Sequence, residues 1–264
     1  MNLSIAALAA PLLALSLVVP TMAAGLPDLG GRSIKAVTEN AYYPLNFADK
    51  TGAGVGLEYD LINEAAKRLN AKVEWSQSAW DVMIEAVRTG QFDIGADGIT
   101  INDERKAQVD FTDPFLTVDQ FFMVRADEAR ITDKDSFTKD TSLLFGAQSG
   151  TSAFYTAIYD VLDGDETNPR VKLFDTFGAS VQALKSGDVD AVIADQAASA
   201  GYIGADPGAF KTVGTPIKSD PLGFILTPKS DLVTPLNAAL AEMKADGTLD
   251  KLTKKWFFDY GASQ

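Results

Sequence analysis

The stretch GADGITINDERKAQVDFTDPF, residues 95–115, joins a short strand of small residues to a helix that begins with acidic side chains. Asn102 is a good N-cap, and Asp103 and Glu104 suit the first turn because a helix N-terminus carries a partial positive charge. The same charge disfavours Arg105, which follows in the third helical position. The sequence therefore predicts that Arg105 faces an anion that makes this position favourable.

Strand-like and helix-like segments alternate on both sides of this stretch. Helical segments have apolar residues at a 3.6-residue period, and strand segments are short apolar runs. The alternation, which occurs twice, is typical of a parallel sheet flanked by helices, so we expect an α/β fold with two similar lobes. We expect strands at 33–39, 72–77, 92–97, 142–148, 171–176 and 189–195, and helices at 57–70, 80–90, 151–162 and 178–187.

Two further apolar segments, at 118–128 and 221–231, each end in charged residues. We expect them to be the crossovers between the lobes. The first lobe is then formed by residues 25–124 and 220–264, and the second by residues 125–219. The helical tail should pack on the first lobe and place Trp256, Phe257 and Phe258 in its core.

The composition excludes several classes of partner. The chain has 264 residues, 22% of them charged, and a formal net charge of −13. An acidic chain is unsuited to nucleic acid and to anionic membrane surfaces, both of which attract basic faces. No spacing of metal ligands and no phosphate-binding loop of the Walker type is apparent, so we expect neither a metal nor a cofactor.

The N-terminal segment, residues 1–24, is apolar and ends in small residues that suit signal peptidase. We expect a cleaved secretory signal peptide, with an N-terminal membrane anchor as the alternative. The chain has no cysteine, which excludes a lipid-modified N-terminal cysteine and disulfides. We therefore expect a soluble exported protein, not a lipoprotein, that resides in the periplasm of a bacterium with two membranes.

Polar and aromatic side chains cluster where the expected strands end, which is where open parallel sheets bind ligands. Each has a simpler interpretation by itself: the aromatics as core residues, Ser, Thr and Asp as helix caps, and Arg105 as half of an exposed ion pair. Together they offer a carboxylate receptor, an ammonium acceptor and flat walls for a side chain, as an α-amino acid requires. The candidates are Asn40, Tyr43, Trp80, Asp97, Gly98, Thr100, Arg105, Thr151, Ser152 and Asp195.

The sequence resembles the type 3 periplasmic solute-binding proteins that serve polar amino-acid ABC transporters. GITINDERKAQVDFTDPF (98–115) is close to the signature of that family; GQFDI precedes it, and GAQSGTS and VDAVIAD follow it, in the expected order. The resemblance covers about residues 33–260. It implies the two-lobed periplasmic-binding-protein fold (type II), with a mostly parallel sheet flanked by helices in each lobe and two hinge crossovers.

The resemblance also implies roles for the candidate residues. For the ligand carboxylate, it implies that Arg105 is a bidentate partner. It implies that Thr100, Thr151 and Ser152 bind the same carboxylate. Those implied for the ammonium are the Gly98 carbonyl and the Asp195 carboxylate, and those implied for the side-chain walls are Tyr43 and Trp80.

Three positions depart from the family pattern. Asn40 stands where an aspartate is common, and YPLNF replaces YPPF, which leaves the wall near Leu45 and Asn46 open to question. Asp97 stands where a small or hydroxylic residue is common. It is either a counter-ion for a basic ligand side chain or a turn cap, and we favour a polar or basic ligand.

The resulting function hypothesis is a monomeric binding protein that closes its lobes around an amino acid and docks on an inner-membrane ABC permease. It lies free in solution, without inserting into the membrane. The alternatives are a cyclohexadienyl-dehydratase-like enzyme on the same fold and a ligand-sensing protein. Absence of histidine and cysteine removes the commonest general base and the thiol nucleophile, which argues against an enzyme.

Overall fold

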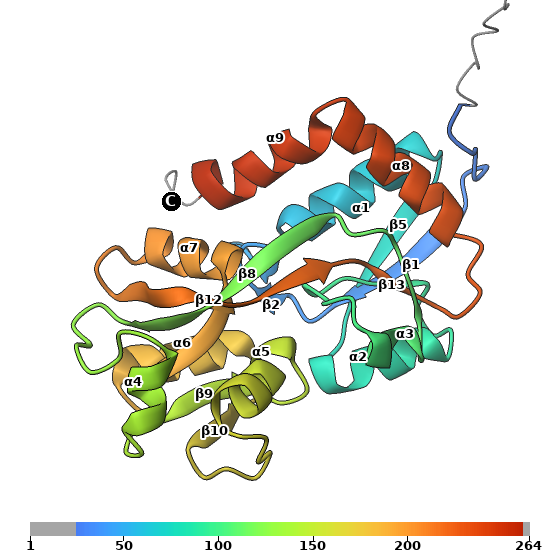
Figure 1. The fold of residues 1–264 in the computed structure, drawn as a ribbon. Helices are drawn as coiled ribbons and strands as arrows, with labels where there is room; N and C mark the ends of the chain where they lie inside the picture. Colours follow the sequence, from blue (N-terminus) through green and yellow to red (C-terminus); the bar gives the residue numbers. More distant parts are fainter. Residues whose placement is uncertain (1–24, 261–264) are drawn as a thin grey trace, which may run out of the picture.

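Two five-stranded sheets organise residues 25–260, the part of the chain that this computed structural model describes (Figure 1). The expected signal peptide, residues 1–24, lies outside the described residues. Each sheet belongs to one lobe and has helices against it, so the two-lobed α/β fold is confirmed.

The first sheet has the strand order β5-β1-β6-β13-β7. Strand β1 runs parallel to β5 and β6, whereas β13 runs antiparallel to β6 and β7. The elements of this lobe are β1 (Ser33–Thr38), α1 (Leu57–Arg68), β5 (Lys72–Gln77), α2 (Trp80–Arg88), β6 (Ile94–Gly95), α3 (Asp103–Lys106), β7 (Asp110–Phe111), β13 (Ile225–Leu226), α8 (Val233–Ala245), α9 (Thr248–Lys254) and the π-helix η2 (Lys255–Asp259).

The second sheet repeats this plan with the order β10-β9-β11-β8-β12. Strand β9 runs parallel to β10 and β11, and β8 runs antiparallel to β11 and β12. The elements are β8 (Leu116–Arg125), α4 (Lys134–Lys139), β9 (Phe145–Gln148), α5 (Ser152–Tyr155), the π-helix η1 (Thr156–Val161), β10 (Val171–Phe174), α6 (Phe177–Ser186), β11 (Ala191–Asp195), α7 (Gln196–Ala205) and β12 (Phe210–Leu222).

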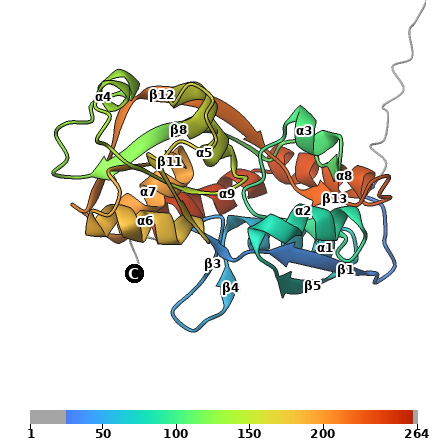
Figure 2. The ribbon, with the colours of Figure 1, turned by 90° about the horizontal axis from the view of Figure 1, so that it is seen from below.

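The lobes are connected by β8 and β12, which lie side by side as an antiparallel pair in both views (Figures 1 and 2). Their ladder is interrupted between Val213 and Lys218, where the register shifts. Strand β8 belongs to the second sheet from Leu116 onward, so the lobe boundary expected near Val124 falls inside this strand.

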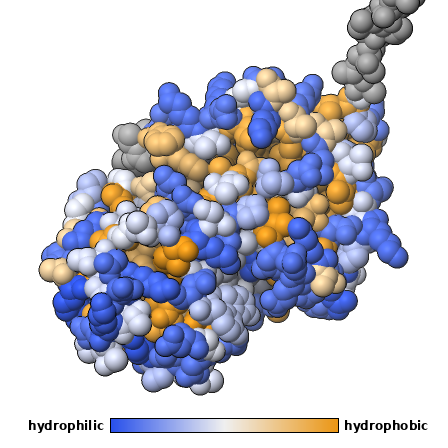
Figure 3. Space-filling view, viewed as in Figure 1, coloured by the Kyte–Doolittle hydropathy of each residue, from blue (hydrophilic) through white to orange (hydrophobic). Residues whose placement is uncertain are grey.

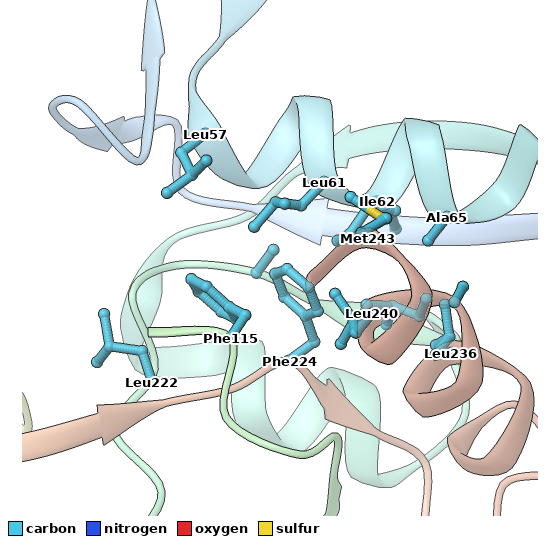
Figure 4. Packing of buried hydrophobic residues seen from close by; sticks show 14 of the residues in the cluster. Leu57, Leu61, Ile62, Ala65, Phe115, Leu222, Phe224, Leu236, Leu240 and Met243 are labelled. Carbon is cyan, nitrogen blue, oxygen red and sulfur yellow. The ribbon is translucent and has the colours of Figure 1, made fainter. Parts of the chain in front are cut away.

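The core of the first lobe lies between α1, α8 and the sheet (Figure 4). Leu61 of α1 and Met243 of α8 are fully buried, and Phe115 stacks on Phe224 with ring centroids 4.6 Å apart. The tail thus packs on the first lobe, as its apolar period predicts. Trp256 is buried in the same core, whereas Phe258 is 69% exposed, so only part of the expected aromatic cluster is core.

A small three-stranded sheet follows β1 and extends from the first lobe (Figure 2). It contains β2 (Ala41–Tyr42), β3 (Asn46–Ala48) and β4 (Gly54–Val55), none of which the sequence pattern predicts. These strands have two or three residues each, which is too short to show a period.

The surface mixes hydrophilic and hydrophobic residues on the face shown in Figure 3. The large hydrophobic side chains exposed among residues 25–260 are Val82, Tyr159, Leu173 and Phe258. No helix within the described range has the length and apolar character needed to cross a membrane.

Candidate binding site between the lobes

A cavity lies between the two lobes where the carboxyl ends of the strands meet. Residues of both lobes and of both crossover strands line it: Glu39, Tyr42, Trp80, Asp97, Gly98, Thr100, Arg105, Val118, Gln120, Gln148, Thr151, Ser152, Ala153, Phe177, Asp195 and Leu222. The lining includes eight of the ten residues expected from the sequence, all but Asn40 and Tyr43.

Among residues 25–260, Arg105 is the one cationic side chain that lines the cavity. Its guanidinium donates to the Thr100 carbonyl at 3.1 Å and to the Gly150 carbonyl of the other lobe at 3.2 Å, and its Cζ lies 5.1 Å from the Trp80 ring centroid. The side chain is only 6% exposed, and among residues 25–260 it forms no ion pair. The exposed ion pair that is the simpler interpretation of Arg105 is therefore not formed.

The physical reason for the unfavourable position of Arg105 differs from the one that the sequence suggests. Helix α3 is a single turn, Asp103–Lys106, so its dipole is small, and Asn102 caps it by accepting the Arg105 backbone N–H at 2.8 Å. The cost comes instead from desolvation: burial lowers the pKa of the Arg105 guanidinium. A buried cation without an ion-pair partner among residues 25–260 favours a bound anion, and that role of Arg105 stays a prediction.

The second lobe contributes two helix caps to the cavity wall. The Thr151 hydroxyl accepts the Phe154 N–H at 3.1 Å and donates to the Gln148 carbonyl at 2.8 Å. Asp195 caps α7 by accepting the Ala198 N–H at 2.8 Å. The cap and the cavity interpretations of these residues are therefore compatible, because each side chain caps a helix that begins at the cavity.

Carboxylates outnumber the single guanidinium in the cavity wall, where Glu39, Asp97 and Asp195 face Arg105 alone. Burial raises the pKa of Asp97 well above its usual range, and the neighbouring Glu58 and Glu39 carboxylates raise it further. Burial likewise raises the pKa values of Asp195 and Glu39. A nearby cation would stabilise the ionised form of these buried carboxyl groups, so the wall favours a cationic ligand group.

Glu58 forms a second acidic layer behind Asp97. It is fully buried on α1, and burial raises its pKa to about 7. Its carboxylate accepts Asn46 Nδ2 at 2.7 Å and the Gly98 N–H at 3.0 Å. Asn46 thus supports this layer and does not form a cavity wall, nor does the buried Leu45.

Two residues expected in the site lie outside the cavity, and in each case the preceding residue lines it. Tyr43 packs on Phe47, with centroids 4.6 Å apart, whereas Tyr42 lines the cavity. Asn40 accepts the Tyr59 hydroxyl at 3.1 Å, whereas Glu39 lines the cavity.

Asn40 has a φ of 62°, in the left-handed region, so the chain turns directly after β1 and the two-residue alternation of the strand does not carry over to Tyr42 and Tyr43. Gly98 is restricted by the same loop. Its φ is +60°, and a Cβ there would lie 2.6 Å from the Tyr42 ring, so glycine alone fits.

Sequence reasoning misses Glu39, Tyr42, Gln120 and Gln148 as cavity residues. Glu39 directly follows β1 and Gln148 ends β9, so both stand at strand ends and were accessible to the rule that located the others. Gln120 lies inside an apolar crossover strand and carries no such signal.

Three pairs of hydrogen-bonded residues within the described part of the chain join the lobes across the cavity. The Tyr42 hydroxyl donates to Asp195, Gln148 Nε2 donates to the Glu39 carboxylate at 2.9 Å, and Arg105 donates to the Gly150 carbonyl. The structure is therefore that of a closed form, in which side chains of both lobes meet around the cavity.

Comparison with known proteins shows which family the chain is similar to. Residues 34–259 match the bacterial extracellular solute-binding proteins, family 3. A probable histidine-binding protein of Neisseria gonorrhoeae is 30% identical over 242 residues, which cover 90% of this chain and 88% of the relative. The lysine/arginine/ornithine-binding periplasmic protein of Escherichia coli (strain K12) is 28% identical over 260 residues, which cover 93% of this chain and 96% of the relative.

Solved structures of amino-acid-binding proteins are also similar to this chain. An ancestral arginine-binding protein bound to arginine has a TM-score of 0.77 and 35% sequence identity, and the match covers 85% of this chain and 98% of that protein.

Proposed function

The chain belongs to the bacterial extracellular solute-binding proteins, family 3, and we propose that it captures a cationic amino acid between its two lobes. The observation that carries this proposal is the charge of the cavity wall, where Glu39, Asp97 and Asp195 surround a single guanidinium. A ligand with one carboxylate and two cationic groups complements that wall. The relatives described above as binding histidine, arginine or lysine support the same ligand class.

Each charged group of such a ligand has a matching partner. Arg105 receives the α-carboxylate, together with Thr100 and the hydroxyls of Thr151 and Ser152 at the start of α5. Asp195 and the Gly98 carbonyl receive the α-ammonium.

The acidic wall of Asp97 and Glu39 receives the cationic side chain, and Trp80 provides a flat wall beside it. Charge-assisted hydrogen bonds contribute about 1.5–3 kcal/mol each, so three or four of them, less the ordering cost, give affinities around micromolar.

The lobes act as the two halves of a clamp. The ligand binds the first lobe through Arg105, and closure about β8 and β12 then brings Thr151 and Asp195 onto it. The closed form gains contacts that an open form lacks, which is what shifts the population. We place the protein in the periplasm, exported by a signal peptide and acting as a monomer that delivers its ligand to an ABC permease.

A thermal-shift screen of the twenty amino acids and ornithine tests the ligand class. Arginine, lysine and ornithine are expected to raise the melting temperature, because a bound ligand stabilises by RT ln(1 + [L]/Kd), about 2.7 kcal/mol at 100 Kd. Glutamate and aspartate are expected to give no shift, since the wall repels a second carboxylate. A larger shift with glutamate than with arginine would contradict the proposal, and turnover of prephenate would favour an enzyme instead.

The affinity for a cationic amino acid is expected to rise between pH 5.5 and 8. Burial holds the pKa of Glu58 at about 7 and that of Asp97 well above its usual range, so the two carboxyl groups are partly protonated in the empty cavity. A cationic side chain favours the ionised form, and binding therefore releases protons. Calorimetry in two buffers of different ionisation enthalpy measures that release directly.

The stability of the ligand-free protein is expected to move in the opposite direction. The folded pKa values of Glu58 and Asp97 are raised above their unfolded values, so their stabilising contribution is complete below the unfolded pKa and is lost as pH rises through the folded pKa. Asp97→Asn provides the control: it removes the Asp97 contribution and should make both pH profiles shallower, while Glu58 continues to titrate. Affinity that falls toward pH 8 in the natural protein would contradict this assignment.

A further inference from the structure

The Gln120 side chain lies where β8 passes the cavity. It is only 5% exposed and is part of the cavity lining. Its Nε2 donates to Asp220 Oδ2 at 2.6 Å, whereas its Oε1 is buried and has no hydrogen-bond partner among residues 25–260. A buried acceptor without a donor is unfavourable by about 1–3 kcal/mol in a folded protein, so this atom requires an explanation.

Asp220 fixes the orientation of the Gln120 amide. Lys218 Nζ lies 3.6 Å from Asp220 Oδ1 and favours the ionised carboxylate, which only accepts hydrogen bonds, so the amide turns its NH₂ group toward Asp220. Asp220 is 3% exposed on β12, where it pairs with Val118, and is therefore a diagonal neighbour of Gln120. Because the NH₂ group is committed to β12, the carbonyl oxygen is directed away from that strand.

The neighbour of Gln120 on its other side is Asp195, its direct register partner on β11. Side chains of directly opposed residues in antiparallel strands lie on one face, with Cβ atoms about 4.5–5.5 Å apart. Both side chains line the cavity. The free oxygen of Gln120 and the carboxylate of Asp195 thus form adjacent acceptors on one wall.

We propose that Gln120 Oε1 accepts a hydrogen bond from the α-ammonium of the ligand, beside Asp195. This inference rests on the proposed function. An ammonium has three donors, and Asp195 already accepts the Ala198 N–H and the Tyr42 hydroxyl, so further acceptors are needed. Gln120 is consequently a binding residue that distinguishes α-amino acids from acids that lack the amino group.

The test compares ligands that differ only in the α-ammonium. L-lysine is paired with 6-aminohexanoic acid, and L-arginine with 5-guanidinopentanoic acid; each analogue retains the carboxylate and the side-chain cation. Gln120→Met removes the acceptor and retains the length of the side chain. We expect it to weaken the amino acids about tenfold to a hundredfold, as for a hydrogen bond to a charged group, and to leave the analogues within about twofold.

An equal loss for amino acids and analogues would overturn the proposal, because that is the result of a structural role through Asp220. Gln120→Glu supplies a second readout that does not depend on weak analogues. It restores an acceptor for the ammonium but places a carboxylate against Asp220, so an affinity for lysine or arginine above that of Gln120→Met supports ligand contact. An affinity below that of Gln120→Met overturns it.

Failure of the proposed function gives a different result. If the natural protein binds neither lysine nor arginine, the ligand class is wrong before any variant is compared. Circular dichroism and the ligand-free melting temperature of each variant report whether it folds.

Discussion

Replacing Arg105 with alanine lowers the affinity for every amino acid by about thirtyfold or more in the outcome we expect. The guanidinium is 6% exposed, and among the described residues it forms no ion pair, so it is available to a carboxylate in a site shielded from water. Removing one partner of a buried, hydrogen-bonded charge pair is unfavourable by about 2–5 kcal/mol, because the other charge stays buried without a counter-ion. Isothermal titration calorimetry with arginine and lysine measures the loss.

Arg105→Lys is the matched control for charge. It retains the cation but lacks the planar fork that meets a carboxylate with two hydrogen bonds and stacks on Trp80. Its affinity should therefore lie between those of the natural protein and Arg105→Ala. An affinity for Arg105→Ala close to that of the natural protein would remove the basis for the carboxylate assignment.

Gly201→Ala is expected to weaken binding about fivefold to a hundredfold without altering the cavity. A Cβ at Gly201 of α7 would lie 2.3 Å from Tyr43 Cε1 and 3.3 Å from Pro44 Cδ, both in the other lobe. Overpacking of this kind costs about 1–3 kcal/mol, and here the cost falls only on the closed form, in which the lobes touch. Titration calorimetry measures the affinity, and small-angle scattering reports whether the lobes close.

Gly204→Ala in the same helix is the control for the substitution itself. A Cβ at Gly204 meets nothing within 4 Å, so this variant should bind normally and be slightly more stable, since alanine is the better helix former. Truncating the ring in Gly201→Ala/Tyr43→Ala should recover affinity relative to Gly201→Ala. Equal affinities for the two glycine variants would show that the Tyr43 contact does not limit closure.

Elements with a strong apolar period could be predicted closely from the sequence. The expected strand at 72–77 is β5, and the expected helix at 57–70 ends two residues late relative to α1. Helix α7 is missed because its sequence, QAASAGYIGA, is mostly small residues without an apolar face. Most of β12 is missed because Gly214 and Pro216 interrupt it at the shift in register.

The sequence predicts that the site residues lie at the ends of strands. It does not predict in which direction each side chain points. Arg105, Thr151 and Asp195 were located by the general rule that ligands bind at the carboxyl ends of strands. Two adjacent tyrosines give the same sequence signal, so the sequence does not distinguish Tyr43 from Tyr42, which is the one that lines the cavity. The roles of these residues in binding stay predictions until the variants above are measured.

The contacts that join the lobes across the cavity also bear on how quickly the ligand escapes. Tyr42 with Asp195, Glu39 with Gln148, and Arg105 with the Gly150 carbonyl are contacts within the protein, and they must separate before the mouth can open. None of them is a contact to the ligand. They therefore raise the free-energy barrier to opening for any ligand. A weakly bound ligand and a tightly bound one are both retained at least as long as the protein takes to break these contacts.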